Sequence, residues 1–104
     1  TAREFIMSIP SRINPEAIAD KDTTFHFQVS GDEGGEFTAT IKDGKAEVTE
    51  GITGESKCTI KTSDKILTKI LEGKQNPQMA VLMGKLNISN LSEMMKFAKI
   101  LGLG

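Results

Sequence analysis

Residues 24–61 alternate between apolar and polar side chains, and this pattern constrains the fold more than any other feature of the chain. Successive side chains of a β-strand point to opposite faces, so each alternating run predicts a strand with one apolar face. Turn signals separate the runs, among them Asp43-Gly44, a strong two-residue hairpin signal. We therefore predict four consecutive strands that form an antiparallel meander. The runs cover residues 24–29, 37–41, 45–49 and 57–61.

The spacing of apolar residues changes after the fourth run from two positions to three or four, which is typical of helices. Polar capping residues and glycines then mark where each element starts and stops. The predicted elements are a helix over 66–71 with Ser63 as cap and Gly73 as terminator, a short helix over 79–83 that starts from Asn76-Pro77 and ends at Gly84, a strand over 86–88, and a last helix over 91–101 capped by Asn90.

The N-terminal segment predicts two short helices, one over residues 2–9 that Pro10 ends and one that Asn14-Pro15 starts. The predicted order is α-α-β-β-β-β-α-α-β-α. A sheet with one apolar face must be covered, so we expect an α/β (α+β) fold with a five-stranded, mainly antiparallel sheet and helices on that face. The length of 104 residues suits one domain, residues 1–104.

Charge and composition exclude several classes of partner. The net charge is -1, and the chain has no Trp or Tyr, so neither a basic surface nor a stacking platform for nucleic acid is expected. Near-neutral charge also predicts that any membrane contact is transient. No apolar run approaches the length of about 20 residues needed for a membrane span. The start lacks a signal-peptide layout, and GLG is not an SKL-type address, so we expect a cytoplasmic location.

The residues that carry most enzyme chemistry are few. His26 is the only histidine and falls on the polar face of the first run, where we expect a surface or rim position. Cys58 is the only cysteine and falls on the apolar face, so the two should not form a nucleophile–base pair. Scattered acids lack metal-ligand spacing. We expect no enzyme activity, no metal and no cofactor.

Methionine is concentrated in the last two predicted helices. Four of the five methionines lie there, Met79, Met83, Met94 and Met95. Methionine is flexible and polarizable, so it fills irregular core gaps and also adapts to variable ligands. From the residues alone both interpretations stay open.

The succession of segments resembles the sterol carrier protein 2 domain family, the non-specific lipid-transfer fold. The resemblance runs from about Phe25 to Gly102, and the Gly84-Lys85-Leu86 step is its most specific part. The chain departs from the family where a glycine usually precedes the last helix, because Ser89 runs directly into Asn90. This shorter junction bears on how the last helix lies over a cavity. The matching segments read HFQVSGDEGGEFTATIKDGKAEVTEG, KCTIKTSD, ILTKILEGK and NPQMAVLMGKLNIS.

The resemblance implies an apolar tunnel between the sheet and the C-terminal helices that binds fatty acyl chains, acyl-CoA, phospholipids or sterols. It therefore implies a non-enzymatic lipid carrier, a monomer or weak homodimer. The alternative is an interaction or dimerisation module of a larger lipid-metabolising system, without a ligand of its own. The residues that we expect to line the tunnel are Met79, Leu82, Met83, Met94, Met95, Phe97 and Leu101 from the helices, and Phe27, Val29, Phe37 and Ile41 from the sheet.

Overall fold

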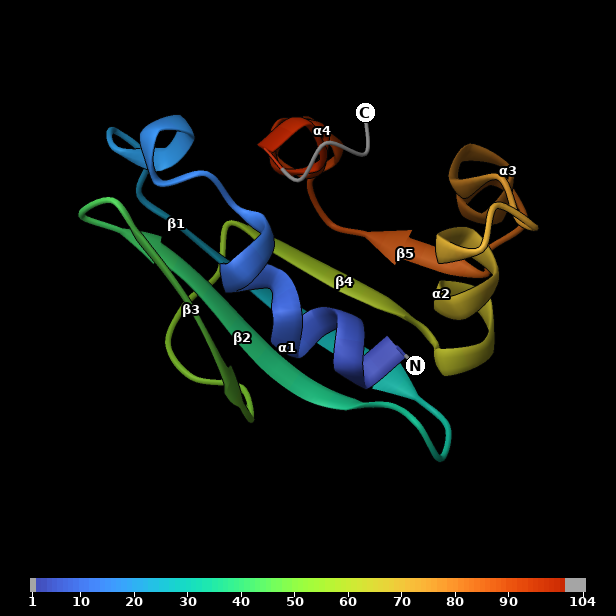
Figure 1. The fold of residues 1–104 in the computed structure, drawn as a ribbon. Coiled ribbons are helices and arrows are strands. Elements are labelled where there is room, and N and C mark those ends of the chain that lie inside the picture. The colour runs from blue at the N-terminus through green and yellow to red at the C-terminus, as the bar shows by residue number, and fades with distance from the viewer. Residues whose placement is uncertain (1, 101–104) are drawn as a thin grey trace.

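A five-stranded sheet forms the centre of the molecule in the computed structural model, which describes residues 2–100 (Figure 1). The strands lie in the order β3-β2-β1-β4-β5. Both central strands β1 and β2 carry buried apolar residues at alternate positions, as the sequence predicts. The strands are β1 Thr23–Ser30, β2 Gly35–Lys42, β3 Lys45–Glu50, β4 Cys58–Ser63 and β5 Leu86–Ile88.

The first three strands form the predicted antiparallel meander. Asp43 and Gly44 join β2 to β3, with φ angles of 53° and 75°. Two positive φ values at the centre of a two-residue loop match the right-handed twist of the flanking strands. The hairpin prediction at this position is confirmed.

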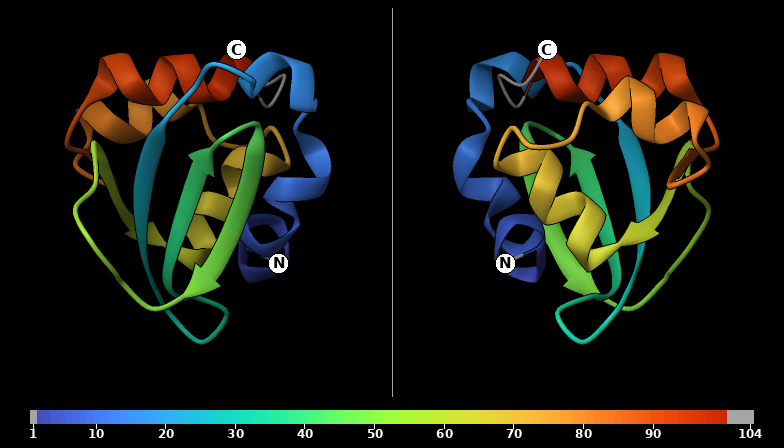
Figure 2. Two further views of the ribbon diagram at one scale, coloured as in Figure 1. Left: turned by 90° about the vertical axis from the view of Figure 1, so that its left-hand side faces the viewer. Right: turned by 90° about the vertical axis from the view of Figure 1, so that its right-hand side faces the viewer.

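The fourth strand contradicts the predicted four-strand meander. β4 does not pair with β3, but crosses to the other side of β1 and pairs with it in parallel, with Phe25 opposite Cys58. Residues 51–57 make this crossover over the sheet face that the helices leave open (Figure 2). The arrangement places β1, with its buried Phe25, Phe27 and Val29, at the centre and leaves the polar β3 as an edge, which alternation alone cannot specify.

The helices cover the apolar face of the sheet (Figures 1 and 2). The order of elements agrees with the predicted one, with a 3₁₀ helix in second place. The largest fully buried side chains fill the space beneath them: Phe25, Phe37, Ile6, Ile9, Ile18, Ile41 and Cys58. The helices are α1 Ala2–Arg12, η1 Pro15–Ile18, α2 Asp64–Leu71, α3 Pro77–Leu82 and α4 Leu91–Ile100.

Helix α1 continues through Pro10, so the prediction that this proline ends the helix is wrong. Proline removes one backbone hydrogen bond, but here it lies in the last turn of the helix. The buried residues Ile9 and Ile13 lie on either side of Pro10, and their packing holds that turn in place.

The predicted caps are confirmed at each later helix. The Ser63 hydroxyl accepts from the Ile66 N–H of α2 at 3.1 Å. The Asn76 side chain accepts from two N–H groups of α3, and the Asn90 side chain accepts from the Glu93 N–H of α4 at 3.2 Å. These bonds satisfy backbone donors that a helix leaves unpaired at its start.

Candidate functional site

The predicted lining residues of the sheet are part of the packed core. Phe27, Val29, Phe37 and Ile41 are all buried in one hydrophobic cluster. The Arg3 guanidinium of α1 lies over the Phe37 ring, 5.4 Å from its centroid, so α1 already covers this part of the sheet. Phe37 and Ile41 therefore pack against protein in this structure.

The predicted lining residues of the C-terminal helices divide into two groups. Phe97 is only 2% exposed and Met94 is half-buried against the core. Four others face solvent, with Leu82 80% exposed and Met95 64% exposed. Leu101 lies outside the described residues. The structure therefore does not gather the predicted set around one cavity, and its role in lipid binding stays a prediction. The other two solvent-facing members are Met79 and Met83.

Helical geometry explains this division. In α3 the buried Ala80 and the half-buried Val81 turn toward the sheet, which directs Met79 and Met83 away from it. In α4, Phe97 takes the position nearest the core, and Met95, two residues earlier, falls on the outer side. Helical period identifies an apolar face from sequence, but both faces of these helices carry apolar residues, so the sequence left undetermined which face packs on the sheet.

A cavity of about 220 Å³ lies where the start of β1 meets α4. Its floor is apolar and consists of Phe25, Phe97 and Ile100. The rings of Phe25 and Phe97 pack with centroids 4.5 Å apart, which fixes α4 to the sheet. The shorter Ser89-Asn90 junction is thus compatible with a last helix that contacts the sheet directly. The remaining lining residues are Asp20, Lys21, Asp22, Thr23, Lys57, Glu93 and Lys96.

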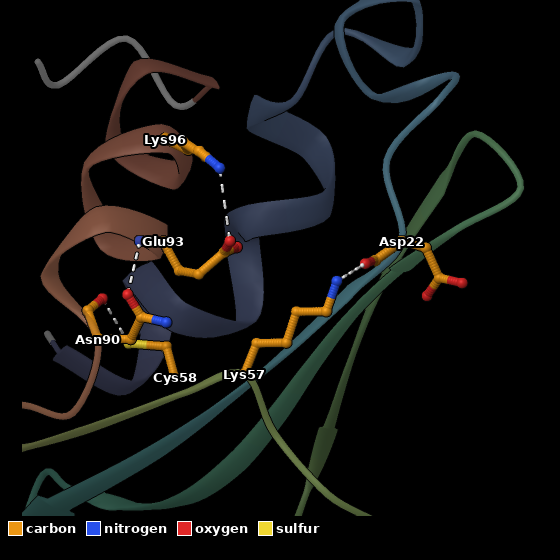
Figure 3. Close-up of polar contacts among 6 residues, drawn as sticks. All are labelled: Asp22, Lys57, Cys58, Asn90, Glu93 and Lys96. Atoms are coloured by element: carbon orange, nitrogen blue, oxygen red, sulfur yellow. Dashed lines mark hydrogen bonds and ion pairs between the residues drawn. The ribbon is translucent and has the colours of Figure 1, made fainter.

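The rim of the cavity is charged on both sides (Figure 3). Lys57 donates from Nζ to the Asp22 carbonyl oxygen at 2.9 Å. Lys96 lies 3.6 Å from Glu93 on α4. Three lysines and three acids line the opening, so the rim is balanced in charge, with ammonium groups contributed by both the sheet side and the helix side.

Thr23 places a polar atom among the apolar residues of this cavity. Its hydroxyl oxygen is buried and has no hydrogen-bond partner among the described residues. Leaving a buried polar group unsatisfied costs about 1–3 kcal/mol. Because this oxygen has almost no accessible surface, the polar end of a ligand would reach it only after the side chains around it move.

Cys58 connects β4 to the start of α4 and is not exposed as a nucleophile. It is fully buried, and its Sγ donates to the Asn90 carbonyl oxygen at 3.5 Å (Figure 3). Burial raises the pKa of the Cys58 thiol, with the Asn90 hydrogen bond acting in the opposite direction. A buried thiol with a raised pKa holds its proton at neutral pH and reacts slowly.

His26 lies on the opposite sheet face from Cys58, as predicted, because it pairs in register with Thr59. The expected surface or rim position is wrong, since His26 is only 7% exposed. The crossover loop covers it, and Nε2 lies 2.9 Å from the Thr53 carbonyl oxygen, to which it donates. Within residues 2–100, no cluster of three or more His, Cys, Asp or Glu side chains could hold a metal ion.

A second hollow, of about 530 Å³, lies on the sheet face away from the helices. Its lining includes the polar residues Gln28, Lys61 and Asn87, and the hollow is shallow and wide open to solvent. A shallow hollow would leave an apolar chain in contact with water, so the more enclosed cavity beneath α4 is the better candidate for lipid.

Several residues of the α4 cavity were not among the predicted lining set. Phe25 follows the same alternation as Phe27, and Ile100 the same helical face as Phe97, so their apolar faces were evident from the sequence. The contributions of Thr23, Lys57 and Lys96 depend on the crossover that places the start of β4 beside β1. No local pattern signals that juxtaposition.

The profile of the SCP-2 sterol transfer family matches residues 5–102, and the chain belongs to this family. Hydroxysteroid dehydrogenase-like protein 2 of Xenopus tropicalis is 31% identical over 102 residues, which are 96% of this chain and 24% of that protein. The chain thus spans about a quarter of the length of this relative. None of the helices within residues 2–100 is long and apolar enough to cross a bilayer.

Solved structures show the same fold. The sterol carrier protein domain 2 of Helicoverpa armigera is 25% identical, with a TM-score of 0.71 over 96% of this chain and 85% of that one. Palmitated SCP2L2 of Aedes aegypti has a TM-score of 0.70 at 15% identity, over 96% of this chain and 90% of that one. The five-stranded α/β architecture is therefore that of the family.

Proposed function

We propose that this protein is a non-enzymatic carrier that binds the acyl chain of a lipid in the cavity between β1 and α4. The observation that carries the proposal is a cavity lined by apolar and charged side chains, beside which the Thr23 hydroxyl is buried without a hydrogen-bond partner among the described residues. Ligand sites typically combine a mostly apolar lining with a few placed polar groups. Fatty acid is the preferred ligand, because one carboxylate could meet Thr23 and the rim lysines, and the palmitated mosquito domain shares the fold.

Entry of an acyl chain requires α4 to move. The cavity of about 220 Å³ lies below the range of roughly 300–1,000 Å³ typical of ligand pockets. Phe97 limits the depth of the cavity through its contact with Phe25. A chain that enters between them replaces one apolar contact with another, at about 0.8 kcal/mol for each buried methylene.

Exchange of the lipid with a bilayer follows from the same free energy of burial. A membrane offers an acyl chain about the same apolar shelter as the protein, so transfer in either direction is close to balanced. No chemical step is needed. Within residues 2–100, Cys58 and His26 lie on opposite faces of the sheet, which supports a carrier rather than an enzyme.

The test is a titration of the purified protein with a fluorescent fatty acid and, in parallel, with its methyl ester. We expect saturable binding, a preference for the acid, and loss of that preference in Thr23→Val. Thr40→Val is the matched control, because Thr40 alternates to the opposite face of the sheet from its neighbours Ala39 and Ile41. Absence of saturable binding by the natural protein would end the proposal. Parallel titrations with acyl-CoA and with a sterol then rank the affinities of the three ligand classes.

A second candidate is an interaction module within a larger protein. The relative from Xenopus tropicalis, of which the match covers 24%, supports it. Light scattering together with native mass spectrometry separates the two candidates. A monomer with co-purified lipid supports the carrier, and an empty dimer supports the module.

A further inference from the structure

We propose that the α4 cavity selects medium-chain fatty acids, because it shelters an acyl chain of about seven carbon atoms and leaves most of a longer chain in water. This inference rests on the proposed carrier function and names the class of fatty acid that the site prefers. Three features carry it: the size of the cavity, the junction that fixes the start of α4, and the packed core behind the cavity floor.

The volume of the cavity sets the first limit on chain length. A methylene group in a liquid occupies about the same volume as a water molecule, about 30 Å³. The cavity of about 220 Å³ therefore holds about seven carbon atoms. A palmitoyl chain needs about 480 Å³, more than twice that volume, so most of it would stay in contact with water.

The face of α4 that borders the cavity gives an independent measure of its length. The lining residues of the helix lie on one side of it, because they have the spacing i, i+3, i+4, i+7: Glu93, Lys96, Phe97 and Ile100. From the first to the last of them the helix rises about 10 Å, at about 1.5 Å for each residue. An extended acyl chain advances about 1.25 Å with each carbon–carbon bond of about 1.5 Å, so about eight bonds span this face. Volume and length therefore agree on a medium-length chain.

The start of α4 is fixed to β4, which limits how far the helix can move. The Ser89 N–H donates to the Thr59 carbonyl oxygen at 3.0 Å, and the Thr59 N–H donates to the Ser89 hydroxyl oxygen at 2.7 Å. The Cys58 thiol donates to the Asn90 carbonyl oxygen (Figure 3). No glycine lies between β5 and α4 to loosen this junction. α4 can therefore swing about its first turn but cannot lift away from the sheet as a whole.

A helix held at one end gains space only toward its other end. The held end is the first turn, where the Asn90 side chain accepts from the Glu93 N–H (Figure 3). Phe97 and Ile100 lie toward the other end, so a swing of α4 admits an acyl chain between these side chains and the start of β1. This movement opens the cavity for entry but adds little length beside Glu93.

The floor of the cavity cannot become deeper without unpacking the core. Phe25 is 1% exposed, and its neighbours across the sheet, Ala39 of β2 and Cys58 of β4, are buried as well. Protein interiors are close-packed, so a chain that displaced these side chains would force others out of their preferred rotamers. The carbon atoms of a longer acyl chain therefore remain outside the cavity.

The sheet side of the opening is held by Lys57. Its backbone N–H donates to the Thr24 carbonyl oxygen at 2.9 Å, and its ammonium group donates to the Asp22 carbonyl oxygen at the same distance (Figure 3). An ammonium group has three donors, so two remain for a ligand carboxylate while the contact with Asp22 is kept. The carboxylate is thus held at the rim, and the length of the acyl chain is measured from there.

The test is a series of competition titrations in which saturated fatty acids displace the fluorescent fatty acid from the purified protein. The competitors are hexanoate, octanoate, decanoate, laurate and palmitate, each kept below the concentration at which it self-associates. From hexanoate to octanoate we expect the inhibition constant to fall about fourfold for each added methylene. From decanoate to palmitate it should change by less than about threefold in all, because the added methylenes stay in water.

Two variants test what sets the limit. Phe97→Ala vacates part of the floor, and Ser89→Gly removes a hydrogen bond of the junction and adds backbone freedom. In both variants the gain for each methylene should continue for about two to four carbon atoms beyond the natural limit. Ser30→Gly is the matched control, because it makes the same change as Ser89→Gly at the far end of β1. It should leave the limit where it is.

The outcomes separate the chain-length limit from the carrier function. A steady gain from hexanoate to palmitate in the natural protein would overturn the limit and leave the carrier function in place. An identical limit in the natural protein and in both variants would overturn it too, since α4 and its junction would then not set the length. If the natural protein shows no saturable binding of the fluorescent fatty acid, the carrier function and the limit are both lost.

Discussion

Phe97 forms part of the cavity floor and also anchors α4, so replacing it should change stability and ligand affinity in opposite directions. Phe97→Ala removes a side chain that is 2% exposed and packs on the Phe25 ring at 4.5 Å. Large-to-small changes of buried phenylalanine cost about 3–5 kcal/mol. Because the vacated space joins an existing cavity, we expect the lower end, about 3 kcal/mol. For a domain of this size that corresponds to a melting temperature lower by roughly 10–20 °C.

The same substitution should tighten binding of an acyl chain. In the natural protein a ligand must separate Phe97 from Phe25, which forfeits an aromatic pair contact of about 0.5–1.5 kcal/mol. The variant has no such contact to lose, so the dissociation constant should fall by up to about tenfold. Thermal unfolding by circular dichroism and calorimetric titration with a fatty acid measure the two effects.

Ile6→Ala is the matched control for Phe97→Ala. Ile6 is 0% exposed but lies on α1, and it is not among the residues that line the α4 cavity. It should lower stability by about 2–5 kcal/mol and leave the dissociation constant unchanged. If Phe97→Ala binds fatty acid more weakly than the natural protein, Phe97 supports the ligand rather than excluding it, and the reasoning fails.

Three further predictions concern the elements around the site. His26→Ala should lower the free energy of unfolding in urea by about 1–2 kcal/mol and speed proteolysis within residues 51–57, because the Thr53 carbonyl loses its donor; an unchanged cleavage rate would show that other contacts hold the crossover. Asn90→Ala should lower the free energy of unfolding by about 1 kcal/mol because it removes the cap of α4, whereas Ser92→Ala, two residues later and exposed, should change it little. Folded Cys58 keeps its proton to a higher pH than unfolded Cys58, because burial raises its pKa above the ordinary thiol value of 9.0. The free energy of unfolding should therefore fall as the pH rises above 9.0, and Cys58→Ala should lack this fall. Equal pH slopes in both proteins would contradict the assignment.

Much of the fold follows from local pattern. Alternation identified the strands, Asp43-Gly44 the hairpin, and Ser63, Asn76 and Asn90 the helix starts, because each signal acts within a few residues. The position of β4 could not be predicted in this way. Alternation states which face of a strand is apolar, but not which neighbour the strand takes.

The candidate site was harder to predict for the same reason. Phe97 was expected to contact ligand from its apolar face, and it does lie at the cavity. The sequence did not distinguish it from Met95, two residues earlier, because the outer face of α4 is apolar as well. Thr23 carried no signal at all, since a threonine at the start of a strand is ordinary, and only the arrangement of α4 above it makes its hydroxyl notable.

The parallel pairing of β1 with β4 also divides the protein into a part that can form early and a part that must wait. The three strands of the meander are neighbours in sequence, whereas the contact between Phe25 and Cys58 closes a loop across β2 and β3. Long loops close slowly, so the β1–β4 ladder should be among the last to form and the rate of folding should depend on it. Everything that lies C-terminal to the crossover, including α3 and α4, follows β4 in the chain, so Phe97 of α4 can meet Phe25 of β1 only after β4 has crossed. Amide hydrogen exchange should therefore be slowest in β1 and β2 and fastest in the three-residue β5, so that the part of the molecule that we propose to open for lipid is also the part that the fold holds least firmly.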